Sequence, residues 1–168
     1  TTINPEAALF EMYHVKTRNA VRKGQKLGLV VQRRADKAAI DWLQSSHQRS
    51  MATMGGVPKS RIVFAELLEQ FPLNSQARLY IGSYNGKSVS GLLVLLFGGT
   101  VEYFTPVVDE HYKDQQALSA LIHHVMVDTS REGFTCWNWG GTWRSQDGLY
   151  RFKSRFGAID MPYRYFHR

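Results

Sequence analysis

The order of hydrophobic patterns along the chain predicts an α/β (α+β) domain with a central mixed, mostly antiparallel sheet flanked by helices. Three consecutive strand patterns are joined by an Asn-Gly turn at 85–86 and a Gly-Gly turn at 98–99, which together predict an antiparallel meander. An amphipathic helix over 113–131, followed by another strand pattern, predicts a β-α-β crossover of right-handed sense. Strands grouped in this way are typical of a mixed sheet, whereas a doubly wound nucleotide fold alternates helices and strands throughout.

The first part of the chain predicts three helices and one short strand. Asn4 followed by Pro5 is typical of an N-cap with proline at the first helical position. The apolar residues that follow recur about every 3.6 positions, and a glycine at 24 or 28 can stop the helix. The later elements are a strand over 29–31, a helix capped by Asp36, a loop over 54–58 and a helix from Ser60 to Pro72.

The second part predicts the sheet and its crossover. The strand over 89–97 is apolar on both faces, which places it at the centre of the sheet. Gly133 and Gly157 are expected to end the two helices of this part. The expected elements are strands over 77–84, 89–97 and 101–105, the helix over 113–131, a strand over 134–139, a short helix over 149–156 and a strand over 161–166.

Length and composition indicate one globular, cytoplasmic domain. A chain of 168 residues is long enough to bury about two-thirds of its unfolded surface. The longest apolar run, over 92–97, has the length of a strand, so no transmembrane segment is expected. Polar residues near the first position do not resemble a secretory signal. The single cysteine, Cys136, excludes an internal disulfide and is expected to be buried on its strand. The oligomeric state stays open.

The chain is basic, with 21 Lys and Arg against 14 Asp and Glu, a formal net charge of +7. Such an excess favours a polyanionic partner, such as nucleic acid, coenzyme A or an anionic membrane surface, although basic proteins also carry charge for solubility alone. The cations gather near both ends and would form one basic face if the ends meet. They are Lys16, Arg18, Arg22, Lys23 and Lys26, and later Arg144, Arg151, Lys153, Arg155, Arg164 and Arg168.

Two segments resemble the FemAB-like branch of the GNAT-fold acyltransferases, which includes peptidoglycan-type aminoacyltransferases. Over 133–141 a glycine-ended helix leads into a strand that closes on a double glycine, and Gly-Leu-aromatic-x-Phe-Lys-x-x-Phe-Gly follows over 148–157. The basic stretch over 18–24 is similar to the helix that opens this family's transferase domain. The element order also resembles the GNAT fold over nearly the whole chain. Residues 1–168 are therefore expected to form a single GNAT-like domain, or one half of a tandem pair.

This resemblance implies transfer of an acyl or aminoacyl group from an activated donor to an amine. The implied donor is acyl-CoA or aminoacyl-tRNA, and the implied acceptor is a small amine or a cell-wall or glycan precursor, with no metal. The coenzyme-A signature of the wider superfamily, Arg/Gln-x-x-Gly-x-Gly/Ala before the long helix, is missing, because 108–114 holds no glycine. The absence of this signature weakens the hypothesis that coenzyme A carries the donor group. It leaves two alternatives open, aminoacyl-tRNA as the donor or a degenerate site.

Three residues are candidates for catalytic roles, and the resemblance implies one for Lys153. Lys153 corresponds to the family's motif lysine, which would stabilise the oxyanion that forms as the amine attacks; otherwise it is a solvated surface lysine. Tyr150 is a candidate acid. Asn138 stands where the family commonly carries an aspartate, and an amide cannot act as a general base. This departure keeps a second hypothesis open, an inactive GNAT-fold binding module with a basic groove for RNA or another anionic partner.

The candidate donor-binding residues are cations and one tryptophan. Arginine holds phosphate through its bidentate fork and lysine as a point charge, although either is often an ordinary exposed residue. A tryptophan on the strand over 134–139 could form one wall of a site for an acyl chain or a nucleobase, although tryptophans in a strand more often belong to the core. The candidates are Arg18, Arg22, Lys23, Trp139, Arg151 and Arg155. The histidines show no metal-ligand spacing.

Overall fold

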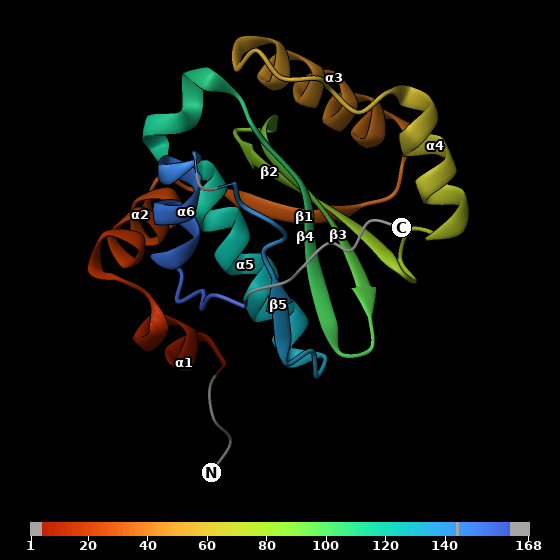
Figure 1. The fold of residues 1–168 in the computed structure, drawn as a ribbon. Coiled ribbons are helices and arrows are strands. Elements are labelled where there is room, and N and C mark those ends of the chain that lie inside the picture. Colours follow the sequence, from red (N-terminus) through yellow and green to blue (C-terminus); the bar gives the residue numbers. More distant parts are fainter. Residues whose placement is uncertain (1–4, 144, 162–168) are drawn as a thin grey trace.

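A five-stranded sheet lies at the centre of the fold, in the strand order β1-β2-β3-β4-β5. The computed structural model describes residues 5–143 and 145–161 (Figure 1). The first four strands pair antiparallel and β5 pairs with β4 in parallel, so the predicted mixed, mostly antiparallel sheet is confirmed. The strands are β1 (Val30–Arg34), β2 (Ala77–Tyr84), β3 (Lys87–Phe97), β4 (Thr100–Val108) and β5 (Cys136–Asn138).

Helices cover both faces of this sheet (Figure 1). The long crossover helix α5 packs on one face, together with the helices from the two ends of the chain. A 3-10 helix, η1 (Glu110–Gln115), leads into α5. The α5 face carries α1 (Pro5–Met12), α2 (Val15–Lys26), α5 (Ala117–Arg131) and α6 (Asp147–Ser154). The opposite face carries α3 (Lys37–Thr53) and α4 (Arg61–Gln70).

The central position of β3 follows from its sequence. Successive side chains of a strand point to opposite faces. Leu92 and Val94 therefore enter the cluster under α5, and Leu93 enters the cluster under α3 and α4. All three are at most 1% exposed. Burying a leucine or valine side chain completely contributes about 1.5–3 kcal/mol, so β3 anchors both layers at once.

The predicted first helix is wrong in one respect, because the chain breaks it into α1 and α2 at Tyr13 and His14. The ring of Tyr13 packs against Phe156, with 5.1 Å between centroids, and the His14 amide donates to the carbonyl of Arg155 at 2.9 Å. His14 then caps α2 by accepting from the Lys16 amide through Nδ1. The break is dictated by contacts with the far end of the chain, which local periodicity does not contain.

The boundaries of α5 and β5 also differ from the predictions. The α5 helix begins at Ala117 rather than 113, because Gln116 is left-handed, with φ of 60°. The strand expected over 134–139 is limited to Cys136–Asn138, where β4 offers a partner, and Cys136 is exposed rather than buried. The strand expected over 161–166 lies, apart from its first residue, outside the described residues. Within the described ranges, no helix is both long enough and apolar enough to span a membrane.

Candidate functional site

The candidate site lies where β4 and β5 separate. The two strands pair only at 100–102 and 136–138, and the chain leaves the sheet after Asn138. β4 also carries a bulge: Leu93 opposes Thr105 and Val94 opposes Tyr103, so Phe104 between them has no partner. A bulge bends its strand and redirects side chains, and such features are frequent beside functional sites. The divergence exposes polar groups at the ends of the paired segment.

Glu102 and Asn138 face each other across this junction. They are register partners, and the side-chain amide of Asn138 hydrogen-bonds the Glu102 carboxylate. The Oδ1 atom of Asn138 accepts from the Gly140 amide at 3.0 Å. Burial raises the pKa of Glu102, and Asn138 and Lys153 oppose part of that rise. The junction therefore holds a carboxylate, although on β4 rather than on β5.

Sequence reasoning missed Glu102. The signal was a single acidic residue in a strand whose alternate positions, Val101, Tyr103 and Thr105, are buried. The side chain of Glu102 points to the other face of that strand. The strand pattern alone shows such a residue as an ordinary outward-facing charge, because the pairing with Asn138 is a tertiary contact.

Lys153 is buried, at 7% exposure, rather than solvated. Its Nζ donates to the carbonyls of Gly140 at 3.2 Å and Gly141 at 3.1 Å, and to Thr142 Oγ1 at 2.9 Å. Burial lowers the pKa of Lys153, and the nearby carboxylate of Glu102 opposes this effect. The ammonium thus fastens the double-glycine loop to α6 and brings a positive charge next to the β4–β5 junction. Its three N–H groups are matched by three acceptors within the protein.

Trp139 attaches the end of β5 to α6 by aromatic packing. The centroid of its ring lies 5.0 Å from that of Tyr103, 5.2 Å from that of Phe156 and 6.3 Å from that of Phe152. The ring therefore has a packing role, and the substrate wall suggested for it stays a prediction. Tyr150 is 48% exposed and its hydroxyl hydrogen-bonds Asp160 at 3.1 Å, which raises the pKa of the phenol. The structure joins Lys153 and Asn138 through one loop but gives Tyr150 a different partner.

A basic pocket of about 360 Å³ lies between α2, α6 and the first turn of α5. Its lining combines three cations with aromatic and small polar side chains. Among the described residues, no salt bridge neutralises these three cations, which are Lys16, Lys23 and Arg155. The lining residues are Lys16, Thr17, Asn19, Ala20, Lys23, Gln116, Ser119, Phe152, Arg155 and Phe156.

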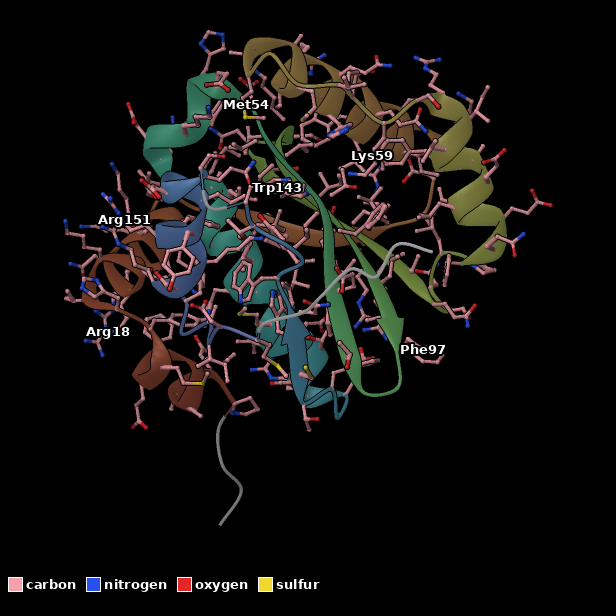
Figure 2. The ribbon with its side chains drawn as sticks, in the orientation of Figure 1. Arg18, Met54, Lys59, Phe97, Trp143 and Arg151 are labelled. Carbon is pink, nitrogen blue, oxygen red and sulfur yellow. The ribbon has the colours of Figure 1, made fainter. Side chains whose placement is uncertain are left out.

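The other candidate cations do not line this pocket. Arg18 donates to the carbonyl of Phe10 at 3.5 Å, and the guanidinium of Arg22 lies 5.3 Å from the centre of the Phe10 ring. Arg151 is exposed on α6. Figure 2 shows Arg18 and Arg151 on the same side of the molecule, where α2 and α6 lie together. Of the second basic cluster, Arg151 and Arg155 thus lie on the side of the molecule that carries α2, Lys153 is buried, and Arg144, Arg164 and Arg168 lie outside the described residues.

The first turn of α5 contributes a favourable dipole to the pocket. Gln116 and Ser119 line the pocket, and no side chain caps this helix end. Free N–H groups at a helix N-terminus attract anions. Gly24 lets α2 approach closely: a Cβ there would lie 2.6 Å from the Cβ of Ala120 and 3.0 Å from the Gln116 carbonyl. The pocket therefore depends on an unusually close α2–α5 contact.

Comparison with known proteins places this architecture in a family. The family model described as "Acetyltransferase (GNAT) domain" matches residues 14–154. The chain belongs to the GNAT acetyltransferase family. The match covers α2 to α6, so it includes the β4–β5 junction, the Lys153 loop and the basic pocket except for Arg155 and Phe156. No curated protein matches the chain.

Solved structures with this GNAT fold are similar in shape but distant in sequence. FemX matches with a TM-score of 0.81 at 13% identity; the match covers 90% of this chain and 56% of the FemX chain, so this GNAT domain corresponds to about half of that protein. An aminoglycoside acetyltransferase from an uncultured soil sample, in complex with sisomicin, matches at 0.62 and 13% identity, covering 83% of this chain and 95% of its own. The ribosomal-protein-S18-alanine N-acetyltransferase from Escherichia coli matches with a TM-score of 0.57 at 17% identity, and the match covers 74% of this chain and 75% of the acetyltransferase chain.

The FemX match agrees with the FemAB-like resemblance of the segments over 18–24, 133–141 and 148–157. Within this GNAT domain those three segments form α2, β5 with its loop, and α6. All three border either the basic pocket or the junction. The motifs therefore converge in space although they are separated in sequence.

Proposed function

We propose that this GNAT domain transfers an acyl or aminoacyl group from a phosphate-bearing donor to an amine, with the donor's phosphates held in the α2–α6 pocket. The observation that carries the proposal is the placement of three cations, Lys16, Lys23 and Arg155, around one pocket beside an uncapped helix N-terminus. Cations and a helix N-terminus are the groups that bind phosphate in proteins. α6, the helix that also carries Lys153, contributes Phe152 to the lining of this pocket.

The chemistry requires no covalent enzyme intermediate. The neutral amine attacks the acyl carbon, a C–N bond forms, and the C–S bond of a thioester or the C–O bond of an aminoacyl ester breaks. The amine loses one proton, and the leaving thiolate or alkoxide takes up a proton to become a thiol or a hydroxyl group. Positive charge and N–H groups close to the developing oxyanion lower the barrier. Lys153 is suited to this role both by its charge and by its hold on the loop over 140–142.

Two observations favour aminoacyl-tRNA over acyl-CoA as the donor. Exposed cations continue beyond the pocket along α2 and α6, as a polynucleotide backbone would require. In the turn before α5, which lacks glycine, the Asp109 side chain accepts from the His111 amide, so this N–H is already used and an acid stands where a pyrophosphate would lie. A small amine or a cell-wall or glycan precursor is the corresponding acceptor.

A binding module without turnover is the second candidate. The three N–H groups of Lys153 already have acceptors, and Asn138 is hydrogen-bonded to Glu102 and Gly140. A fold that keeps these contacts could bind a polyanion through the pocket and perform no transfer. The two candidates differ in turnover and agree in binding.

The first test is a titration with acetyl-CoA and, separately, with aminoacyl-tRNA at two salt concentrations. We expect salt-sensitive binding of the tRNA, and we expect Lys23→Ala to weaken it and to lower the slope of log affinity against log salt by about 1. Lys37→Ala, an exposed lysine on the opposite helical layer, is the matched control and leaves both unchanged. Saturable acetyl-CoA binding would identify coenzyme A as the donor carrier instead, and equal effects of the two variants would contradict the pocket assignment.

A measurement of turnover distinguishes the two candidate functions, an enzyme and a binding module without turnover. With the donor that binds, the rate of acyl transfer to an amine is measured for the wild type and for Lys153→Ala. An enzyme loses most of its rate in the variant while donor affinity is kept. An unchanged rate would show that Lys153 does not act at the transfer centre.

A further inference from the structure

A second pocket of about 430 Å³ lies on the β3–β4 hairpin, away from the basic pocket. The described residues that line it are Leu95, Phe97, Gly98, Thr100 and Glu102. Leu95 is the register partner of Glu102, and Phe97 is the partner of Thr100, so these four side chains share one face of the hairpin. In Figure 1 the hairpin extends away from α3 and α4.

This pocket and the basic pocket open on opposite faces of the sheet. Leu96 and Val101, which alternate with the pocket residues, are buried in the cluster under α5. The basic pocket lies on that same α5 side, between α2 and α6. A donor and an acceptor bound in the two pockets would therefore approach the β4–β5 junction from different sides.

The lining of the hairpin pocket combines one carboxylate with an apolar wall. Phe97 is 79% exposed, which is unusual for a phenylalanine and leaves its ring available to a ligand (Figure 2). Leu95 is half-buried beside it, and Glu102 lies at the junction end of the pocket. A carboxylate pairs with an ammonium group, while leucine and phenylalanine cover an alkyl chain, and an aromatic face also attracts a cation.

Glu102 connects this pocket to the transfer chemistry. It faces Asn138 across the junction and lies within the electrostatic field of Lys153, the residue proposed for the transfer centre. An aspartate at position 138 would place a second carboxylate beside Glu102 and disfavour the ionised form of both. The asparagine instead donates to Glu102 and supports its charge. An asparagine at position 138 is therefore consistent with Glu102 of β4 providing the carboxylate that the family commonly carries at position 138.

We infer that the hairpin pocket is the acceptor subsite and takes a primary amine carried on an apolar chain, with Glu102 holding the ammonium group and Phe97 and Leu95 covering the chain. The role of this pocket as an acceptor subsite rests on the proposed acyl transfer, but the binding of the amine requires no donor. Asn138 acts as a positioning residue for Glu102. The pocket selects against neutral alcohols and against carboxylates of the same chain length.

The test is a titration of the full chain with n-hexylammonium chloride, followed by NMR of the backbone amides. We expect saturable shifts at Gly98, Thr100 and Glu102, and affinity for 1-hexanol and for hexanoate lower by about tenfold or more, because neither supplies a cation to the carboxylate. Glu102→Gln, nearly isosteric, removes the preference for the amine. Glu69→Gln, an exposed glutamate on α4, is the matched control and leaves binding unchanged.

A second readout uses pH and needs no variant. The amine is charged throughout the range below its own pKa, so affinity follows the ionisation of Glu102. Burial raises the pKa of Glu102, and affinity should rise as the pH rises through that pKa. A pH-independent affinity, equal binding of hexanol, or shifts confined to the α2–α6 pocket would each overturn the inference. Amine binding without any donor binding would overturn the proposed transfer and leave the amine site standing.

Discussion

Lys153 combines two properties that are usually separate in a lysine. It is almost fully buried, and its ammonium group has an acceptor for each N–H. Sequence reasoning selected this residue from its motif but gave no acceptors, because the carbonyls of Gly140 and Gly141 are more than ten positions away in the chain. The motif lysine is therefore also a structural residue of the double-glycine loop.

Replacing Lys153 with methionine tests this structural role. Lys153→Met keeps the aliphatic stem and leaves two carbonyls and one hydroxyl without their donor, at a cost of about 1–3 kcal/mol in the free energy of unfolding. Urea denaturation measures the change. The same substitution at Lys26, which is exposed on α2, should stay within about 0.5 kcal/mol of the wild type. Equal losses in the two variants would show that the loop does not depend on the ammonium group.

At the scale of elements, the contact between α2 and α5 sets the shape of the basic pocket. Gly24→Ala gains up to about 1 kcal/mol in helix propensity, but its new methyl group would meet Ala120 and the Gln116 carbonyl. Overpacking of this kind costs about 1–3 kcal/mol, so we expect net destabilisation in urea, together with weaker donor binding. Gly148→Ala in α6 is the control, since no atom lies within 4 Å of its Cβ and the propensity gain remains. Stabilisation by both variants would contradict the close contact.

The elements that sequence predicted well are those whose signals are local. The strand over 77–84 and the turns at 85–86 and 98–99 lie where the pattern placed them, and Asp36 and Ser60 cap α3 and α4 through hydrogen bonds to Ala39 and Val63. The break at Tyr13 was missed because a distant phenylalanine causes it. The same reason explains the short β5, whose length is set by β4.

Across the whole molecule, one ionic network ties β1, β2 and α5 together. Arg33 of β1 bonds to Asp128 at 2.7 Å and also to Glu132, and Arg78 of β2 bonds to Glu132 at 2.5 Å. Tyr80 donates to the same oxygen of Asp128 at 2.6 Å. Burial raises the pKa of Glu132, but the hydrogen bonds from the two arginines outweigh it and lower the pKa overall. The network joins an edge strand to the crossover helix.

Arg78 and Glu132, the ion pair of this network with the most buried arginine, should respond differently to mutation. Glu132→Gln leaves Arg78, which is 8% exposed, without its carboxylate, and we expect a loss of about 1–3 kcal/mol in the free energy of unfolding. Arg78→Met removes the buried charge as well and should cost less. Urea titrations of both variants and of the double variant measure the difference. A larger loss for Arg78→Met would show that the guanidinium stabilises the fold through contacts other than Glu132.

The candidate site was predictable only in part at this scale. The sequence contained Lys153, Asn138 and the two basic clusters, and the fold brought Lys16 and Lys23 of the first cluster together with Arg155 of the second at one pocket. Glu102 and Phe97 were missed, because a glutamate in a strand and a phenylalanine at its end are ordinary until the hairpin register sets them on one face. Register is a property of two strands together, and single-strand patterns do not contain it.

The hold of Lys153 on its loop has a consequence for motion. The loop over 140–142 is fastened by α6, and α6 in turn is fastened by His14, whose amide binds the carbonyl of Arg155. Segments that stabilise one another in this way open together rather than one by one. The amides of Gly140 and Phe156, far apart in sequence, would then exchange with solvent deuterium through a shared opening, and the proposed transfer centre would be either fully formed or fully disrupted.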